Sequence, residues 1–430
     1  MMLSNITTAI IPREAAAAAA SAAHTAYFNG ALTWLFSFGG PALDMQYDDS
    51  TLTLTSAGTP DPFVIRAGGR FYMTFTTGNR IEIWSSRSLV DIESTASKHV
   101  IWTPPPGTDH SADLWAPELH ALRGRWYVYY AAAHPAQGNK SHRMYVLGGP
   151  PAHEDPCQGQ WEFLGRIHDT PPDQWAIDGT VFEIERNGTS ELYFAYSGWP
   201  IDSHGNPVDR ESDLVQQLFI VPLEDPTTAA ASVLPVMISR PDQPWEITRD
   251  AEGRDHGINE GPQFLRSPDG AWAGLVYSCA GSWTNEYKMA CLELKPGGDP
   301  MDPGSWRKSR GPLIQTRKGG CGPYGPGHGS FVDLGSGETI AVYHATDSPT
   351  DGWENRRARV QRVGFNEAGP YMGCKTFGRR YKGGLVTRLK AKVAEIVETA
   401  HAQAHGGRRK SELSGAEALR ALLEGDKGPE

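Results

Sequence analysis

The chain has 430 residues, and its 21% charged and 39% hydrophobic content is typical of a water-soluble globular protein. A formal net charge of −10 argues against nucleic acid as the main partner. The sequence contains no stretch of about 18 apolar residues, so we expect neither a transmembrane helix nor a membrane partner. The 48 glycines and 32 prolines imply many turns, which favours short strands over long helices.

The first 43 residues precede any repeated strand pattern. Residues 15–20 are all alanine, a low-complexity run. We therefore expect residues 1–43 to form a partly disordered N-terminal arm, or alternatively to supply a strand that closes a ring of sheets. A basic segment followed by an unbroken apolar core is missing after Met1, so we expect no signal peptide from the sequence itself.

One strand pattern then recurs five times. Each copy has an apolar run, a turn rich in Gly, Asn or Asp, and an aromatic-rich strand. The residues that mark the copies are 57, 60, 82 and 68 residues apart, and they are Asp61, Glu118, Asp178, Glu260 and His328. Internal periods of this size are typical of propeller blades. We therefore predict an all-β protein with a five-bladed β-propeller over residues 44–381. The alternative is a two-sheet β-sandwich whose hairpins match by chance.

The composition changes after Lys382, where apolar residues recur at helical spacing through Leu385, Leu389 and Val393. Ser414 and Glu417 form a capping-box pattern ahead of a second apolar run. The pattern predicts a short helical C-terminal tail over residues 382–430. This tail either packs poorly or binds a partner.

The five cysteines lack the C-x-x-C spacing of a zinc or redox site. Cys279 and Cys291 flank a predicted hairpin and could face each other across it. Buried free thiols are the alternative.

Three of the marker residues are acidic and open an apolar run: Asp61, Asp178 and Glu260. If the copies are blades, carboxylates at the same structural position in each copy meet at one axis. Paired carboxylates can perform acid/base chemistry on a glycosidic bond, provided that burial or a neighbouring negative charge raises the pKa of the acid. The alternative for each residue is an acid that caps a turn or pairs with an arginine.

The order of these motifs resembles glycoside hydrolase family 43, whose members are five-bladed propellers that act on arabinose- and xylose-containing polysaccharides. The resemblance covers about residues 61–377. The matching segments are Asp61-Pro62, Trp115-Ala116-Pro117-Glu118, Ile177-Asp178-Gly179-Thr180, Asn259-Glu260-Gly261-Pro262 and Gly325-Pro326-Gly327-His328.

The resemblance implies a catalytic role for each of the three acids. Asp61 is then the general base that activates water for a single inverting step, and Glu260 is the general acid. Asp178 raises the pKa of Glu260 and orients it. The inverting class predicts a separation of roughly 6.5–9.5 Å between the carboxyl groups of Asp61 and Glu260.

The resemblance also suggests substrate-binding residues. Trp115 corresponds to an aromatic residue that lines the sugar pocket, and Trp283 could wall the same pocket; packing roles are the alternatives. Arg359 could reach the sugar hydroxyls or the catalytic acids. His328 corresponds to an axial histidine that lies beside calcium or water in the channel. No cofactor is required, and a structural calcium bound to His328 through water is compatible with this pattern, as is a channel histidine without metal.

We therefore predict an inverting glycosidase that removes terminal α-L-arabinofuranosyl residues from arabinan or arabinoxylan. A β-xylosidase or an endo-arabinanase is the alternative, and a non-catalytic sugar-binding propeller is a remoter one. The short helical tail leaves no room for the C-terminal β-sandwich usual in the family's β-xylosidases, which favours the first choice. The expected partner is an arabinose- or xylose-containing plant cell-wall saccharide, bound by a monomer. The family resemblance implies secretion, whereas the sequence shows no clear signal peptide.

Overall fold

The computed structural model describes residues 51–372, with the exception of residues 187, 209–213, 317–322 and 336. All of them fall within one of the two compact units into which the chain divides. The predicted N-terminal arm, residues 1–43, and the predicted helical tail, residues 382–430, lie outside the described residues.

The first two sheets are antiparallel and four-stranded, and each is formed by consecutive strands. The first contains β2 (Phe63–Ala67), β3 (Arg70–Thr74), β4 (Ile81–Ser86) and β5 (Ser97–Trp102). The second contains β6 (Ala112–Leu122), β7 (Arg125–Ala133), β8 (Arg143–Pro151) and β9 (Glu162–Arg166). The short helix α4 (Ile92–Thr95) precedes β5, and the 3-10 helix η2 (Gly138–Ser141) lies between β7 and β8.

The next two blades share one ten-stranded sheet, because β12 and β16 pair in parallel over a few residues. The third blade contains β10 (Ala176–Arg186), β11 (Thr189–Gly198), β12 (Val215–Asp225), β13 (Thr228–Ala229) and β14 (Val236–Ser239). The fourth contains β15 (Ile247–Arg249), β16 (Asp255–Arg266), β17 (Ala273–Cys279), β18 (Lys288–Leu294) and β19 (Trp306–Lys308), with η3 (Pro244–Glu246) and η4 (Pro303–Ser305) beside it.

The fifth blade is completed by the first described strand of the chain. It contains β20 (Tyr324–Asp333), β21 (Thr339–Thr346), β22 (Arg357–Asn366), β23 (Gly369–Tyr371) and β1 (Leu52–Thr53). Leu52 lies opposite Val360, and Thr53 lies opposite Arg359. A strand from the N-terminal side therefore ties the last blade to the first, which closes the ring.

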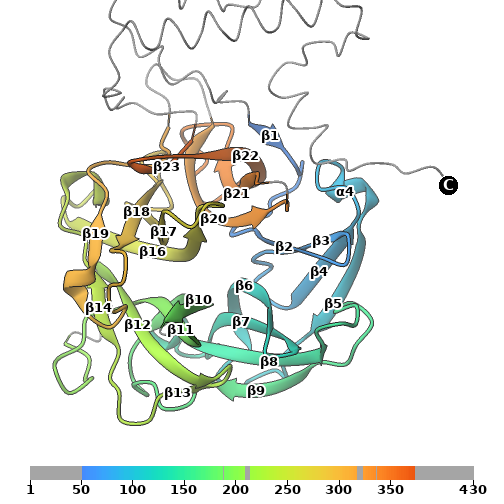
Figure 1. The fold of residues 1–430 in the computed structure, drawn as a ribbon, viewed down its shortest axis with the longest axis horizontal. Helices are drawn as coiled ribbons and strands as arrows, with labels where there is room; N and C mark the ends of the chain where they lie inside the picture. The colour runs from blue at the N-terminus through green and yellow to red at the C-terminus, as the bar shows by residue number, and fades with distance from the viewer. Residues whose placement is uncertain (1–50, 187, 209–213, 317–322, 336, 373–430) are drawn as a thin grey trace, which may run out of the picture. The chain divides into compact units, whose positions relative to one another are not determined.

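The innermost strands are β2, β6, β10, β16 and β20, and they surround a common centre (Figure 1). Each of them contacts the innermost strand of the next blade, and β20 contacts β2. The prediction of a five-bladed β-propeller is therefore confirmed for the described part of the chain.

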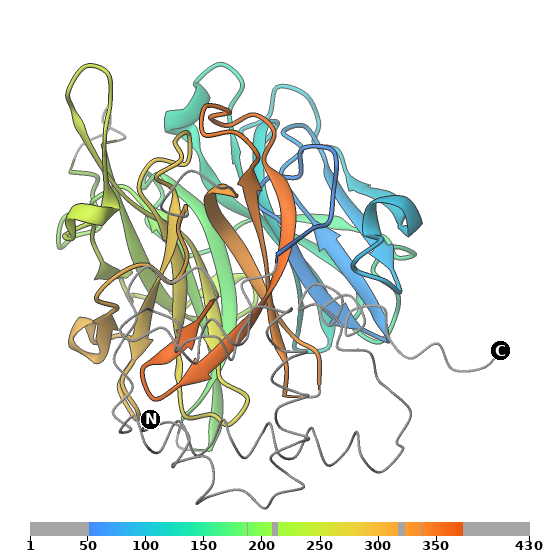
Figure 2. The same cartoon turned by 90° about the horizontal axis from the view of Figure 1, so that it is seen from above.

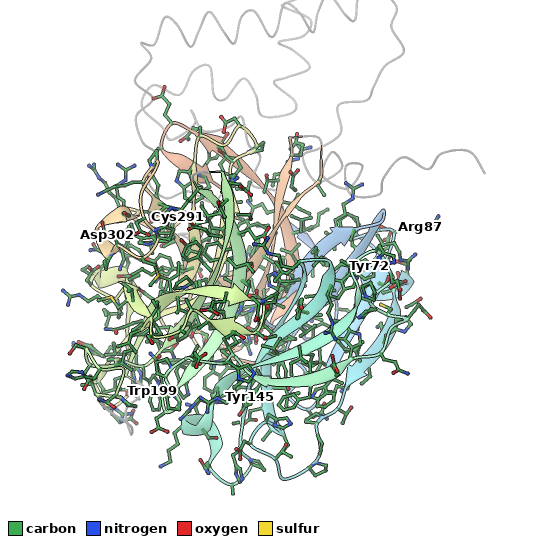
Figure 3. The ribbon with its side chains drawn as sticks, turned by 60° about the horizontal axis from the view of Figure 1, so that its bottom comes forward. Tyr72, Arg87, Tyr145, Trp199, Cys291 and Asp302 are labelled. Carbon is green, nitrogen blue, oxygen red and sulfur yellow. The ribbon has the colours of Figure 1, made fainter. Side chains whose placement is uncertain are left out.

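The hydrophobic core lies between the blades. Each of five buried clusters draws its side chains from two neighbouring blades, and together the clusters run around the ring. The aromatic second strands supply the largest buried side chains, among them Trp126, Tyr196, Tyr277 and Tyr343. In Figure 3, Tyr72 and Tyr145 lie among the packed side chains, whereas Arg87 and Asp302 lie at the periphery. Burial of aromatic area between sheets is the main stabilising contribution to such a ring.

Tight turns set the strand register within each blade. Gly68 and Gly69 join β2 to β3 with φ angles of 55° and 72°, a pair of left-handed residues that glycine adopts without strain. This turn places Val64 opposite Met73, so both apolar side chains enter the same core cluster.

The two hairpin cysteines do not face each other. Cys279 lies opposite Lys288, and Cys291 lies opposite Val276, which puts the two residues on different rungs of the β17–β18 ladder. Neither forms a disulfide. Among the described residues, no helix combines the length and the apolar character that a membrane span needs.

Candidate active site

Within or just before each innermost strand, the backbone has the same irregularity. One residue there adopts a positive φ, and a proline or glycine follows it in every blade; these residues are Asp61, Ala116, Asp178, Gly261 and His328, with φ angles of 56°, 43°, 56°, 54° and 43°. In β6, β10, β16 and β20 the strand register shifts at this point. Non-glycine residues with positive φ are strained, and such strain is often found at functional sites.

This pattern corrects the expectation that the three acids occupy the same position in their blades. Asp61 and Asp178 are equivalent, and His328 is their counterpart in the fifth blade. Glu260 stands one residue earlier, because Gly261 takes the left-handed position of β16. Its counterpart in the second blade is Trp115. The side chain of Glu260 therefore leaves its strand one residue before the position that Asp61 and Asp178 occupy in their blades.

The carboxylate of Asp61 lies among positively charged and hydrogen-bonding groups. Its Oδ2 accepts a hydrogen bond from Thr76 Oγ1 at 2.6 Å, and its Oδ1 lies 3.4 Å from Arg356 Nη1. His328 Nδ1 lies 3.4 Å from the same oxygen. Burial raises the pKa of Asp61, but the Arg356 guanidinium and His328 lower it by more, so the pKa of Asp61 falls below its usual range. Asp61 is therefore ionised.

A neutral histidine holds the strained backbone of Asp61. Burial lowers the pKa of His344 to about 4, so its ring carries no charge near neutral pH. The backbone N–H of Asp61 donates a hydrogen bond to Nδ1 of this ring at 3.0 Å. Thr76 adds a second link, since its hydroxyl accepts from Ala116 N at 2.7 Å and donates to Asp61. The first, second and fifth blades thus share in positioning one carboxylate.

Asp178 contacts the axial histidine and the backbone of the residue that follows Glu260. Its Oδ2 accepts a hydrogen bond from Gly261 N at 3.1 Å and lies 3.7 Å from His328 Nδ1. The residue is 5% exposed. Burial, and then the negative charge of Asp61, raise the pKa of Asp178 well above its usual range.

Glu260 is buried and has one strong hydrogen-bond donor. Tyr287 donates its hydroxyl to Oε1 at 2.8 Å. Burial raises the pKa of Glu260 to about 8, and the charge of Asp178 contributes to the shift. The site therefore holds a carboxylate that is ionised at neutral pH beside a carboxylic acid that keeps its proton. Such a pair suits general base and general acid chemistry.

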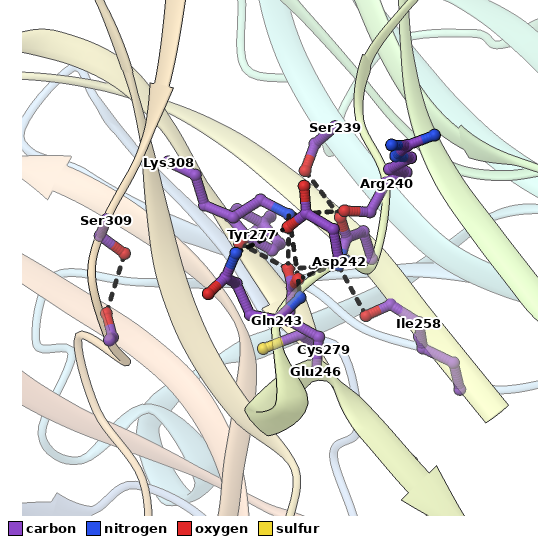
Figure 4. Close-up of polar contacts among 12 residues, drawn as sticks. Ser239, Arg240, Asp242, Gln243, Glu246, Ile258, Tyr277, Cys279, Lys308 and Ser309 are labelled. Carbon is purple, nitrogen blue, oxygen red and sulfur yellow. Dashed lines mark hydrogen bonds and ion pairs between the residues drawn. The ribbon is translucent and has the colours of Figure 1, made fainter. Parts of the chain in front are cut away.

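A buried polar network fixes the strand that carries Glu260. The preceding residue, Asn259, donates to Glu246 Oε1 at 2.8 Å, and Tyr277 OH donates to the same oxygen at 2.8 Å. Lys308 Nζ lies 3.0 Å from both oxygens of this fully buried carboxylate. Figure 4 shows Glu246 at the centre of these contacts. Since Asn259 adjoins Glu260, the network limits movement of the acid along β16.

We expect Lys308→Met to lower the free energy of unfolding by about 3 kcal/mol, because it leaves the carboxylate of Glu246 buried without its cation. Urea unfolding followed by fluorescence measures the loss. Lys295→Met is the matched control, since Lys295 is exposed, and it should change stability by less than about 0.5 kcal/mol. Equal stability of the two variants would contradict this account of Glu246.

Trp115 is held flat against a buried histidine. The rings of Trp115 and His142 are stacked, with their centroids 3.8 Å apart and an interplanar angle of 24°. Both nitrogens of His142 are fixed by backbone oxygens, those of Asn139 at 2.9 Å and Asp113 at 3.0 Å. The backbone N–H of Ala116, next to Trp115, reaches Asp61 through Thr76.

Trp283 belongs to a second aromatic group, in the loop between β17 and β18. It meets His256 edge to face at 5.3 Å and Trp353 at 5.9 Å. Tyr287, which donates to Glu260, ends the same loop.

The structure does not bring Arg359 to the acids. Its side chain is buried against Thr53 of β1, with Nη1 at 2.9 Å from Thr53 Oγ1, and it pairs with Asp347. Arg356 is the arginine that reaches Asp61. Arg356 lies in the loop before β22, whereas Arg359 lies within the strand.

The residues around His328 do not form a site that binds calcium directly, and calcium bound through water stays a prediction. His328 directs Nδ1 toward the carboxylates of Asp61 and Asp178. Within the described ranges, no group of three or more His, Cys, Asp or Glu side chains is arranged to hold a metal. Since calcium takes six to eight oxygen ligands, we derive no role for it.

The sequence did not point to Thr76 or His344, and it favoured Arg359 where the structure brings the nearby Arg356 to Asp61. His344 lies near the end of the aromatic strand of the fifth copy, two residues before Thr346, and that position was a usable signal. Thr76 lies in a loop 15 positions from Asp61, and Arg356 lies in a loop 295 positions from it, so no strand pattern assigned either side chain to that carboxylate.

Five blades that bring three acids together, one ionised and two with raised pKa, define a glycosidase with an acid/base site. The chain belongs to the glycosyl hydrolases family 43, whose model matches residues 54–371. This result confirms the family resemblance of the motifs.

Named relatives and a solved structure agree with this assignment. The chain is 34% identical over 292 residues to the extracellular exo-alpha-(1->5)-L-arabinofuranosidase of Streptomyces chartreusis, a match that covers 66% of this chain and 79% of that relative. It is 31% identical over 353 residues to the enzyme of the same name from Streptomyces avermitilis, covering 78% of this chain and 66% of the relative. The crystal structure of an alpha-L-arabinofuranosidase from Lactobacillus brevis matches with a TM-score of 0.63 and 28% identity, over 77% of this chain and 98% of that one.

Proposed function

We propose that this protein is an inverting exo-α-L-arabinofuranosidase that removes terminal α-L-arabinofuranosyl residues from arabinan or arabinoxylan. The observation that carries the proposal is the opposite shift of two pKa values at one site, upward to about 8 for Glu260 and downward for Asp61. The names of the relatives support the choice of arabinose over xylose.

The proposed reaction is a single displacement. Glu260, protonated at neutral pH, donates its proton to the glycosidic oxygen as the bond to the anomeric carbon breaks. Tyr287 OH occupies Oε1 of Glu260, so the proton leaves from Oε2. Asp61, ionised, removes a proton from the water that attacks the opposite face of the sugar. The arabinose is released with inverted configuration.

The neighbouring residues hold these two groups in their opposite states. Asp178 disfavours ionisation of Glu260 and fixes the β16 backbone through Gly261. Arg356 stabilises the anion of Asp61. We assign Trp115 to the pocket, where its flat ring would pack against the C–H face of the sugar. Trp283 walls the leaving-group side, and Arg359 anchors the closing strand β1 instead of the sugar.

Activity should fall on the alkaline side of a pH profile as Glu260 loses its proton. Because the pKa of Glu260 is raised to about 8, kcat/KM should decline above about pH 8 with unit slope. The acidic limb should lie low, since the pKa of Asp61 is depressed. A profile from pH 4 to 10 tests this; an alkaline limb near pH 5 would contradict the assignment of Glu260 as the acid.

The proposed substrate class is tested by three assays on the native protein. Turnover of 4-nitrophenyl α-L-arabinofuranoside, but not of 4-nitrophenyl β-D-xyloside, is the expected result. Release of arabinose from linear arabinan, without longer products, supports exo action. Preferential turnover of the xyloside would favour a β-xylosidase, and release of oligosaccharides would favour an endo-arabinanase. A folded protein that hydrolyses none of these substrates would favour a sugar-binding propeller.

We also propose that the enzyme works as a monomer. Light scattering should then give a mass near 46.9 kDa; a value near twice that mass would contradict this part of the proposal.

A further inference from the structure

Trp353 is an exposed aromatic side chain beside the acid/base site. Among the described residues, the large hydrophobic side chains with high exposure are Val100, Val208, Val215, Leu234 and Trp353. Trp353 is the only aromatic one in that set, and it is 60% exposed. A large flat apolar ring left in water is a common feature of binding surfaces.

The ring of Trp353 is held in place on one edge. Its Nε1–H donates to Ser282 Oγ at 3.0 Å, and its ring meets Trp283 at 5.9 Å with an interplanar angle of 67°. Both contacts are to the loop between β17 and β18. A ring that is already ordered loses little conformational entropy when a ligand binds to its open face.

The position of Trp353 connects it to both carboxylates. Its backbone carbonyl accepts a hydrogen bond from Arg356 Nε at 3.0 Å, and Arg356 lies 3.4 Å from Asp61. The loop that its indole contacts ends at Tyr287, which donates to Glu260. Figure 2 shows the loop between β21 and β22, in orange, at the same end of the propeller as η2, in teal. Antiparallel pairing of β20 and β21 places this loop beside the first residues of β20, the strand that carries His328.

We propose that the open face of Trp353, backed by Trp283, binds the pentose unit on the leaving-group side of the scissile bond. This inference rests on the proposed function. The indole contacts the loop that ends at Tyr287, the hydrogen-bond donor to the general acid Glu260, and this acid protonates the oxygen of the departing sugar. The next sugar of a 1,5-linked chain would therefore stand near the indole, where its C–H groups cover apolar ring area.

A purely structural role of Trp353 is distinguishable from this one. The contact to Arg356 uses the backbone carbonyl of residue 353, so a change of side chain leaves that atom in place. Loss of the indole should therefore weaken binding of the leaving group more than it disturbs Asp61.

The test compares two substrates that differ only in the leaving group, α-1,5-linked arabinotriose and methyl α-L-arabinofuranoside. For Trp353→Ala, the ratio of kcat/KM for the triose to that for the methyl glycoside should fall about tenfold, mainly through a higher KM. Trp353→Phe keeps a flat ring and should recover most of this ratio. Val100→Ala, on the outer strand β5, is the control for loss of an exposed hydrophobic side chain and should keep the native ratio.

Each outcome decides the matter. An unchanged ratio in Trp353→Ala overturns the inference, as does an equal loss on both substrates, which would mean that the residue supports the catalytic groups instead of the sugar. If a thermal melt shows that Trp353→Ala is unfolded, quenching of tryptophan fluorescence by arabinotriose is compared between Glu260→Gln and the double variant Glu260→Gln/Trp353→Phe. Equal quenching in the two would overturn the inference. A native enzyme that hydrolyses no arabinofuranoside would instead refute the proposed function on which the inference rests.

Discussion

Glu260→Gln should lower kcat on arabinotriose by about 10³-fold while the fold stays intact, because the amide cannot donate a proton to the glycosidic oxygen. Glutamine has nearly the same volume and can still accept the hydrogen bond of Tyr287. Glu260 is buried with a raised pKa, so removal of its titratable group should not reduce thermal stability. The measurement is kcat at neutral pH, with the melting temperature as the folding check.

The leaving group provides the internal control for this variant. With a 2,4-dinitrophenyl leaving group, which departs without protonation, the loss should be far smaller than with arabinotriose. Glu183→Gln, the same change at a half-exposed residue of β10, should have native activity. If Glu260→Gln retained most of its activity on arabinotriose, Glu260 would not be the acid.

Asp61→Gly should lower activity by about 10⁴-fold, because no group remains to take the proton from the attacking water. Glycine is the informative substitution here, since residue 61 has a φ of 56° and glycine adopts that conformation without strain. The space vacated by the carboxylate can admit a small anion. Added azide should then restore turnover and yield the inverted glycosyl azide.

A residue with the same backbone conformation serves as the control for this second variant. Asp169 also has a positive φ, of 61°, and its side chain is exposed. Asp169→Gly should keep native activity and show no response to azide. Rescue of Asp61→Gly that gives a product of retained configuration would mean that Asp61 is not the base.

The sequence allowed the fold to be predicted because the repeat is local. Each copy carries its own turn and its own alternating strands, so Gly68–Gly69 and the aromatic strands were readable without knowledge of the rest. The closing strand was harder to place, since β1 has only Leu52 and Thr53 and pairs with a strand about 300 residues away. Two residues are too few to give a periodic signal.

The acids could be predicted, whereas most of their partners could not. Asp61, Asp178 and Glu260 stand in motifs that a single pass along the chain reveals. Arg356 and His344 act on Asp61 across 295 and 283 positions, and their roles depend on ring closure. The one-residue offset of Glu260 was overlooked, although proline follows Asp61 directly and follows Glu260 only after Gly261.

The loops that carry Trp283 and Trp353 lie outside the repeated strand pattern. Trp283 and Trp353 come from different blades and meet edge to face only in the folded chain. The alternation of inward and outward side chains can be predicted only within strands, and neither Trp283 nor Trp353 lies in a strand.

The anomeric configuration of the first product tests the central claim most directly: water, activated by Asp61, displaces the leaving group in one step while Glu260 supplies the proton. Proton NMR of a fresh reaction with an α-L-arabinofuranoside separates the two anomers before they equilibrate. The account predicts that β-L-arabinofuranose appears first and the α anomer follows only by mutarotation. Initial release of the α anomer would show a double displacement and contradict the roles given to both residues.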